Sequence, residues 1–404
     1  MRGPGWLAIA SSLLVAAAFG GGAKAAGTYD PGATDTTITI GNSAPYSGNL
    51  SATSMGSKVA TAYFKMLNDK GGINGRKIIF KSYDDGYNPA RTVEQVRRLV
   101  EEDQVLLVFS IPGTPTNLAV ERYLNQKKVP QLFAAAGASR LHDYEHYPYT
   151  VGFIPSYVGE GTIYGRYIAA NMPDAKIGVL RQDDDYGRDF LDGLERGLAD
   201  KAKAMIVADV TYQPTDPAVY SQVATLQGSG ATHFVNITTP KFAAQAIARA
   251  YDIGWKPVQF LNSVSYSIGA VIEPAGPEKA KGVISAIIAK DFSDPAWAND
   301  PGVQEFAAFM KQYAPDFDPH DSFTGQGYIE VQLISEVLRR CGDNLTHENI
   351  MRVVTSLDHV TFGMLLPGIS ITLTPTNYNT IASQQLVRFD GTSWVRFDQP
   401  LSGL

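Results

Sequence analysis

Residues 37–71, TITIGNSAPYSGNLSATSMGSKVATAYFKMLNDKG, contain a strand followed by a helix. Residues 37–41 alternate polar and apolar side chains, as a strand with one buried face does. In residues 57–70 the apolar side chains recur at helical spacing, at Val59, Ala60, Tyr63, Phe64 and Leu67. Gly71 favours a helix end there, because glycine adopts the left-handed conformation of many helix stops. The stretch therefore predicts one β-loop-α unit.

The same unit recurs along the chain. A first series has strands at 77–83, 105–110 and 129–134, a helix from Pro89 and a helix at 116–127. A second series after Tyr149 has helices at 159–171, 189–200, 218–227 and 241–253 and strands at 176–181, 205–212, 233–237 and 258–262. A strand at 282–289, helices at 302–313 and 324–340 and a β region from 368 follow. Parallel strands joined by helices predict an α/β fold with two Rossmann-like, doubly wound lobes.

The N-terminal segment is typical of an export signal. Arg2 is followed by an apolar run over residues 6–19, and Ala23-Lys24-Ala25 has the small residues that a signal peptidase recognises. We therefore expect residues 1–25 to be a signal peptide and the protein to act in the periplasm, without membrane insertion after cleavage. A retained N-terminal anchor is the alternative.

Composition excludes some function classes. Charged residues make up 18% of the chain and hydrophobic ones 44%, which is ordinary for a globular protein. The net charge of −6 comes without long runs of one sign, which argues against nucleic acid as a partner. Cys341 is the single cysteine, so an internal disulfide is impossible. The length favours two domains.

Three loops that follow strands are rich in small and hydroxyl residues, at 42–48, 111–116 and 135–139. In open parallel sheets ligands bind outside the carboxyl ends of the strands, where such loops meet. Glycine, proline and serine in a loop also simply form turns, which is the alternative for each loop taken alone. Three such loops in one predicted sheet favour a ligand site.

Catalytic motifs are missing from the sequence. It contains no G-x-S-x-G elbow, P-loop or paired cysteines, so we expect no enzyme activity, although a secreted hydrolase is an alternative. His142 and His146 have a spacing that could hold zinc, but a solvated turn is the preferred interpretation. Asp183, Asp184 and Asp185 are expected to cap a helix rather than to bind a cation. We therefore predict no metal and no cofactor.

Several motifs resemble the periplasmic leucine/isoleucine/valine-binding proteins. They are ITIGNSAPYSG at 38–48, NDKGGINGR at 68–76, YDD at 83–85 and DDYG at 184–187. The resemblance implies a type I periplasmic-binding fold whose chain crosses a three-segment hinge. It places the first lobe at 36–151 plus 286–383 and the second at 152–285 plus 384–404. It also implies a monomer that binds a small-molecule ligand and delivers it to an inner-membrane ABC permease.

The resemblance also implies a set of ligand-binding residues. They are Thr53, Pro112, Gly113, Thr114, Ala136, Gly137, Ala138, Ser139, Tyr186, Thr239, Val264 and Phe323. Two of them depart from the family's pattern. Where the relatives have an acidic residue that binds the ligand's ammonium, this chain has Val264, and where they have an aromatic residue, it has Thr53. A buried ammonium without an anionic partner costs several kcal/mol. We therefore expect a small carboxylate without an ammonium, such as an aromatic or short-chain acid. A ligand-sensing receptor or regulatory module of the same fold is the alternative.

Overall fold

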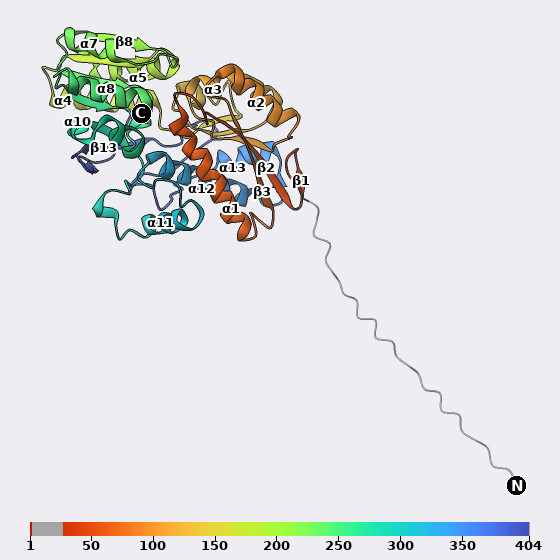
Figure 1. Ribbon diagram of the computed structural model, residues 1–404. Helices are drawn as coiled ribbons and strands as arrows, with labels where there is room; N and C mark the ends of the chain where they lie inside the picture. The colour runs from red at the N-terminus through yellow and green to blue at the C-terminus, as the bar shows by residue number, and fades with distance from the viewer. Residues whose placement is uncertain (2–26, 404) are drawn as a thin grey trace.

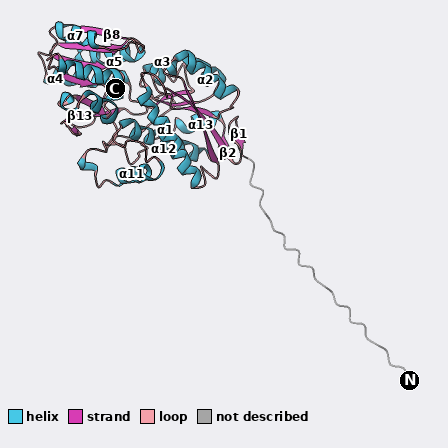
Figure 2. Ribbon diagram, in the orientation of Figure 1, coloured by secondary structure: helices cyan, strands magenta, loops and turns pink. Residues whose placement is uncertain are grey.

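The computed structural model describes residue 1 and residues 27–403 of the chain, so the predicted signal peptide lies almost wholly outside the described residues. The described part contains two α/β lobes, each with helices packed around one sheet (Figure 1; Figure 2). The predicted α/β, two-lobe fold class is thereby confirmed.

The first sheet has five parallel strands in the order β3-β2-β4-β5-β6. Their bounds are β2 (Thr37–Ala44), β3 (Lys77–Asp84), β4 (Leu107–Phe109), β5 (Gln131–Ala134) and β6 (Thr150–Gly152). The connecting helices are α1 (Met55–Asp69), α2 (Pro89–Glu101) and α3 (Thr114–Lys127). The strand order reverses between β2 and β4, and this reversal leaves a crevice at the carboxyl ends of the strands.

The second sheet has the order β14-β13-β11-β10-β9-β7-β8, with β15 (Leu401–Ser402) paired to β13. The parallel strands are β7 (Ile177–Gln182), β8 (Ile206–Tyr212), β9 (His233–Ile237), β10 (Val258–Leu261) and β11 (Ile284–Ile287). The antiparallel strands are β13 (Ser383–Phe389) and β14 (Trp394–Arg396). Its helices are α4 (Tyr157–Asn171), α5 (Asp185–Leu198), α6 (Ala202–Met205), α7 (Tyr220–Gly228), α8 (Pro240–Asp252), α9 (Glu273–Ala275) and α10 (Pro277–Ala280).

The segment between β11 and β13 returns to the first lobe. It carries α11 (Pro301–Tyr313), α12 (Ser322–Cys341), β12 (Asn344–Leu345) and α13 (His347–Val354), and β12 pairs with β1 (Thr28–Tyr29). Helix α12 packs against α1, as Figure 1 also shows. The lobe boundaries given above, 36–151 plus 286–383 and 152–285 plus 384–404, stay a prediction.

Two details of the predicted secondary structure were wrong. The β region expected from Gly368 begins as a regular strand only at Ser383, because residues 360–377 form isolated bridges between turns. Helix α13 was not predicted, since its eight residues are too few for a clear helical period. Among the described residues, no helix is both long and apolar enough to span a bilayer.

Candidate functional site

A cavity lies where the carboxyl ends of the strands of both lobes meet. It encloses about 590 Å³ of space that no atom fills, part of it open to solvent. Both lobes and α12 contribute to its lining. The lining residues are Leu50, Thr53, Gly56, Ser57, Tyr87, Ser110, Pro112, Gly113, Thr114, Ala135, Ile154, Tyr157, Tyr186, Thr239, Val264, Phe323, Gln326, Gly327 and Glu330.

The N-terminus of α3 faces the cavity at Gly113 and Thr114. A helix start presents N–H groups that have no partner within the helix, and these groups favour an anion or a carbonyl. Here the Gly113 N–H donates to the Ala135 carbonyl oxygen and Pro115 has no N–H, so the Thr114 N–H is the donor of this turn that lines the cavity.

Thr114 Oγ1 is buried and forms no hydrogen bond of normal geometry with any described residue, although it lies close enough to Tyr157 to affect that phenol's pKa. Ser57 Oγ, on α1, likewise forms no hydrogen bond of normal geometry with any described residue, although it lies close enough to Tyr46 to affect the pKa of that phenol. Buried hydroxyls in a cavity without partners indicate a polar ligand.

Aromatic rings form much of the remaining wall. The rings of Tyr157 and Tyr186 lie 4.7 Å apart between centroids, and Tyr87 and Phe323 also line the space. Burial raises the pKa of Tyr157 and Tyr186 above that of a free phenol, so both hydroxyls are protonated at neutral pH. The wall is therefore neutral and apolar enough to pack against an aromatic or branched ligand.

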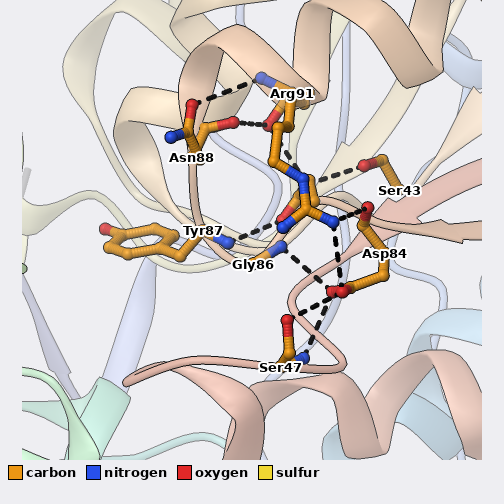
Figure 3. A network of polar contacts seen from close by, with 9 residues as sticks. Ser43, Ser47, Asp84, Gly86, Tyr87, Asn88 and Arg91 are labelled. Carbon is orange, nitrogen blue, oxygen red and sulfur yellow. Dashed lines mark hydrogen bonds and ion pairs between the residues drawn. The ribbon is translucent and has the colours of Figure 1, made fainter.

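Tyr87 is positioned by a hydrogen-bonded turn after β3 (Figure 3). Asp85 accepts hydrogen bonds from the Tyr87 backbone N–H at 2.9 Å and from Ser43 Oγ at 2.6 Å. Asp84 accepts from Ser47 Oγ at 2.7 Å, which ties the turn to the loop after β2. The backbone of Tyr87 has a φ of 61°, which is unusual for a residue with a side chain. The turn thus fixes the ring at the cavity.

Gly113 makes room for that ring. Its φ is +91°, and a Cβ atom placed on it would lie 2.3 Å from Cε2 of Tyr87. Any side chain at this position would displace the tyrosine or the helix start. Glycine is therefore required here both for backbone conformation and for space.

Hydrogen bonds connect this wall to the second lobe. Gln182 Nε2 donates to the Tyr87 hydroxyl at 3.0 Å, and the Tyr212 hydroxyl donates to Gln182 Oε1 at 3.0 Å. Tyr212 in turn accepts from the Thr239 backbone N–H at 2.9 Å. Thr239 lines the cavity directly. The chain of bonds holds the lobes in a closed arrangement around the cavity.

Comparison with known proteins identifies the family. The model of the family described as "Periplasmic binding protein" matches residues 37–390. The chain belongs to this periplasmic binding protein family. The two α/β lobes and the cavity between them agree with membership of this family.

A curated relative of this periplasmic binding protein is "Leu/Ile/Val-binding protein homolog 3" of Brucella melitensis, which is 28% identical over 206 residues. That match covers 48% of the chain and 52% of the relative, so it spans about half of the length of either protein.

Solved structures share the fold. A substrate-binding periplasmic protein from Ralstonia solanacearum is 24% identical with a TM-score of 0.79, over 89% of this chain and all of the other. A branched-chain amino acid transporter protein from Thermus thermophilus with bound valine has 17% identity and a TM-score of 0.80, covering 91% and 97% of the two chains. A fatty acid transporter protein from Thermomonospora curvata has 20% identity and a TM-score of 0.76, covering 93% and 95%.

Eight of the twelve predicted ligand-binding residues line the cavity of this periplasmic binding protein. They are Thr53, Pro112, Gly113, Thr114, Tyr186, Thr239, Val264 and Phe323. Their role in ligand binding stays a prediction.

The structure does not bring Ala136, Gly137, Ala138 and Ser139 to the cavity. The Gly137 carbonyl accepts from the Tyr157 N–H, and both Ser139 N and Oγ donate to Asp189 of α5, at 2.6 and 3.1 Å. The loop after β5 therefore contacts the second lobe at the rim of the cleft.

Residues of α12 are one part of the lining that sequence reasoning missed. Phe323 was predicted, but Gln326, Gly327 and Glu330 lie on the same helix face at spacings of three, four and seven residues. A search along the helical period from Phe323 would have found them. Tyr87 and Tyr157 were also missed, because nothing in their local sequence distinguishes them from core tyrosines.

The two histidines that could hold zinc do not come together as a metal site. His142 Nδ1 pairs with the Tyr378 carbonyl oxygen at 2.9 Å, whereas His146 pairs with Asp143, and residues 27–403 hold no cluster of three or more metal-ligating side chains. Asp184 caps α5 by accepting from Gly187 N, as the sequence predicted.

Proposed function

We propose that this protein is the solute-binding component of an ABC importer, acts in the periplasm and binds a small carboxylate between its lobes. The observation that carries the proposal is the cavity at the start of α3, where the Thr114 N–H lies beside aromatic rings together with the buried hydroxyls of Thr114 and Ser57, which form no hydrogen bond of normal geometry with described residues. Such donors hold an anion without a basic residue. The curated relative and the family support binding of a small molecule rather than its conversion.

The mechanism is closure of the two lobes over the ligand. A ligand docks on the first lobe at Gly113 and Thr114, and the second lobe adds Tyr186, Thr239 and Val264. Closure expels water, which strengthens each remaining hydrogen bond. Binding thereby shifts the balance between open and closed forms, and an inner-membrane permease recognises the closed form. The protein works as a monomer and requires neither cofactor nor nucleic acid.

The second-lobe wall favours an acid without an ammonium group. Val264 is apolar and lies where the family resemblance implies an acidic partner for an ammonium. The carboxylate of an aromatic or short-chain acid satisfies the donors at α3, and its apolar body packs between Tyr157, Tyr186 and Phe323. This arrangement supports ligands such as benzoate or isovalerate.

Release of the natural ligand tests the proposed function. Protein purified from its native periplasm is denatured and the released small molecules are identified by mass spectrometry, while calorimetry compares benzoate, butyrate and isovalerate with leucine and valine. A carboxylic acid bound at one site per chain supports the proposal. Tight leucine binding without competition from any acid would contradict the ligand class, and turnover of the released compound by the protein would contradict the binding role.

A further inference from the structure

Glu330 is an acid within the ligand cavity. It lies on α12 and is only 2% exposed. Gln326 Nε2 donates to its Oε1 at 2.8 Å, and Ser110 is hydrogen-bonded to its Oε2. Ser110 has a φ of +51°, a costly conformation for serine. Since Ser110 directly follows β4 and lies three residues before Gly113, the acid is connected to the start of α3.

No positive charge compensates Glu330. Among the described residues that line the cavity, none is lysine, arginine or histidine, and the remaining titratable groups there are the phenols of Tyr87, Tyr157 and Tyr186. Charged groups behind the second-lobe wall are engaged elsewhere, since Asp184 accepts from Gln182 and Glu160 accepts from Ser263. Helix α1 contributes Gly56 and Ser57, and α3 contributes Thr114, all uncharged. An ionised Glu330 would therefore share the cavity with a ligand anion and no cation.

We propose that Glu330 binds the ligand in its protonated form, so that one proton is taken up with each carboxylate that enters the cavity. This inference rests on the proposed function. The protonated acid donates a hydrogen bond to Ser110, whose own hydroxyl hydrogen is then free to point to a ligand oxygen at the start of α3. Two carboxyl groups in one neutral cavity share a proton because both cannot ionise at close range. Burial already raises the pKa of Glu330 to about 7.

The expected signature is a pH-dependent affinity. Benzoate and isovalerate stay ionised above pH 5.5, so a change in affinity between pH 5.5 and 8.5 reports on the protein. Below the pKa of Glu330 the affinity is constant, and above it the dissociation constant rises by about tenfold per pH unit, because one proton must be bound first. Calorimetry of the wild-type protein at pH 8 in two buffers of different ionisation enthalpy should show about one proton taken up per ligand.

Two variants separate the contribution of Glu330 from other effects. Glu330→Gln keeps the shape and a hydrogen-bond donor, so it should bind the acids with a flat pH profile and exceed the wild-type affinity at pH 8.5. Glu336→Gln is the matched control, since Glu336 lies on the same helix, outside the cavity, and pairs with Arg339 and Arg340. It should keep the wild-type profile. If Glu330→Gln does not fold, the proton count of the wild type decides alone.

Several outcomes would overturn the inference. Acids that bind the wild type with a flat profile and no proton uptake would contradict the role of Glu330 while leaving the proposed function intact. Benzylamine or isoamylamine binding that strengthens as pH rises, and that Glu330→Gln abolishes, would show that an ionised Glu330 pairs with an ammonium. If none of the acids binds at any pH, the carboxylate ligand class fails and the proton coupling fails with it.

Discussion

At the residue scale, Thr114 shows how a binding site differs from a stable core. Its hydroxyl is buried at the start of α3 and forms no hydrogen bond of normal geometry with residues 27–403, although Tyr157 lies nearby. A buried polar atom in this state costs about 1–3 kcal/mol until something satisfies it. Thr116, two residues later, is satisfied, because its hydroxyl donates to the Pro112 carbonyl oxygen at 2.6 Å. The two threonines therefore predict opposite effects of the same substitution.

Thr114→Val should weaken ligand binding by about tenfold, since one hydrogen bond to the ligand is lost. The unfolding temperature of the ligand-free protein should stay unchanged or rise, because the substitution removes a buried polar atom that forms no hydrogen bond of normal geometry with residues 27–403. Thr116→Val should instead lower that temperature. Thermal unfolding and calorimetric titration measure both quantities. A ligand-free Thr114→Val protein as destabilised as Thr116→Val would show that the Thr114 hydroxyl supports the fold.

Gly56 and Gly327 form a close contact between α1 and α12 at the cavity floor. A Cβ atom on Gly327 would lie 2.6 Å from the Gly56 Cα, whereas one on Gly325 would meet only Met364 Cε at 3.7 Å. Gly327→Ala should therefore destabilise the protein by about 1–3 kcal/mol by separating the helices. Gly325→Ala, in the same helix, should be neutral or stabilising by up to about 1 kcal/mol, because alanine favours helix. Equal denaturant midpoints for the two variants would contradict this packing argument.

At the scale of elements, the periodic parts of the chain were predictable. Helices such as α1 and α8 follow the hydrophobic period closely, since one face of each packs in a core, whereas a central strand such as β9 is a short, mostly apolar run buried on both faces. More than half of the cavity lining was not predicted, although the helical period of α12 from Phe323 could have pointed to its part. Gln326 and Glu330 reach the cavity only because α12, distant in sequence, packs against α1. The loop at Ser139 has the composition of a ligand loop. In the structure, however, Ser139 bonds to Asp189 of α5 and does not line the cavity.

Contacts between elements at the rim stabilise the closed form. Asp189 on α5 accepts from Ser139 in the loop after β5, and Asn49 accepts from Lys241 Nζ at 2.9 Å and donates to the Pro214 carbonyl oxygen at 2.7 Å. Neither contact involves a residue that lines the cavity. They therefore act on the balance between open and closed forms rather than on ligand contacts.

Asp189→Ala should shift the ligand-free protein toward the open form and weaken ligand affinity by about three- to tenfold, because hydrogen bonds to a carboxylate are lost. Small-angle scattering should show a larger radius of gyration without ligand and the wild-type value at saturation. Asp192→Ala is the control, since Asp192 is exposed on the same helix. An unchanged radius and affinity in Asp189→Ala would show that the rim contact does not influence closure.

At the scale of the whole molecule, the segment between β11 and β13 leaves the second sheet and returns to it. Glu160 on α4 lies where it returns. The carboxylate accepts from Ser263 N at 2.7 Å and from Gln384 Nε2 at 3.4 Å. Glu160 is buried and has no basic partner among residues 27–403, and burial raises its pKa to about 7. Glu160 thus connects the loop after β10 to β13, the strand with which the chain re-enters the second sheet.

The stability of the molecule should therefore depend on pH through Glu160. In the unfolded chain the acid has a pKa of about 4.3, below its folded value, so the folded state binds a proton more readily. This contribution is fully present below about pH 4.3, and it is lost as pH rises through 7. The loss amounts to about 3–4 kcal/mol by pH 8, because one pKa unit corresponds to about 1.4 kcal/mol.

The glutamine of Glu160→Gln cannot ionise. The free energy of unfolding of this variant should therefore increase relative to that of the wild type as pH rises from 5 to 8. The buried histidines titrate in both proteins, so their contribution to the pH dependence of stability cancels in the difference. Urea denaturation at pH 5, 6, 7 and 8 measures the difference. A difference that stays constant across this range, or that narrows as pH rises, would mean that Glu160 is ionised in the folded protein throughout and is compensated by its hydrogen bonds.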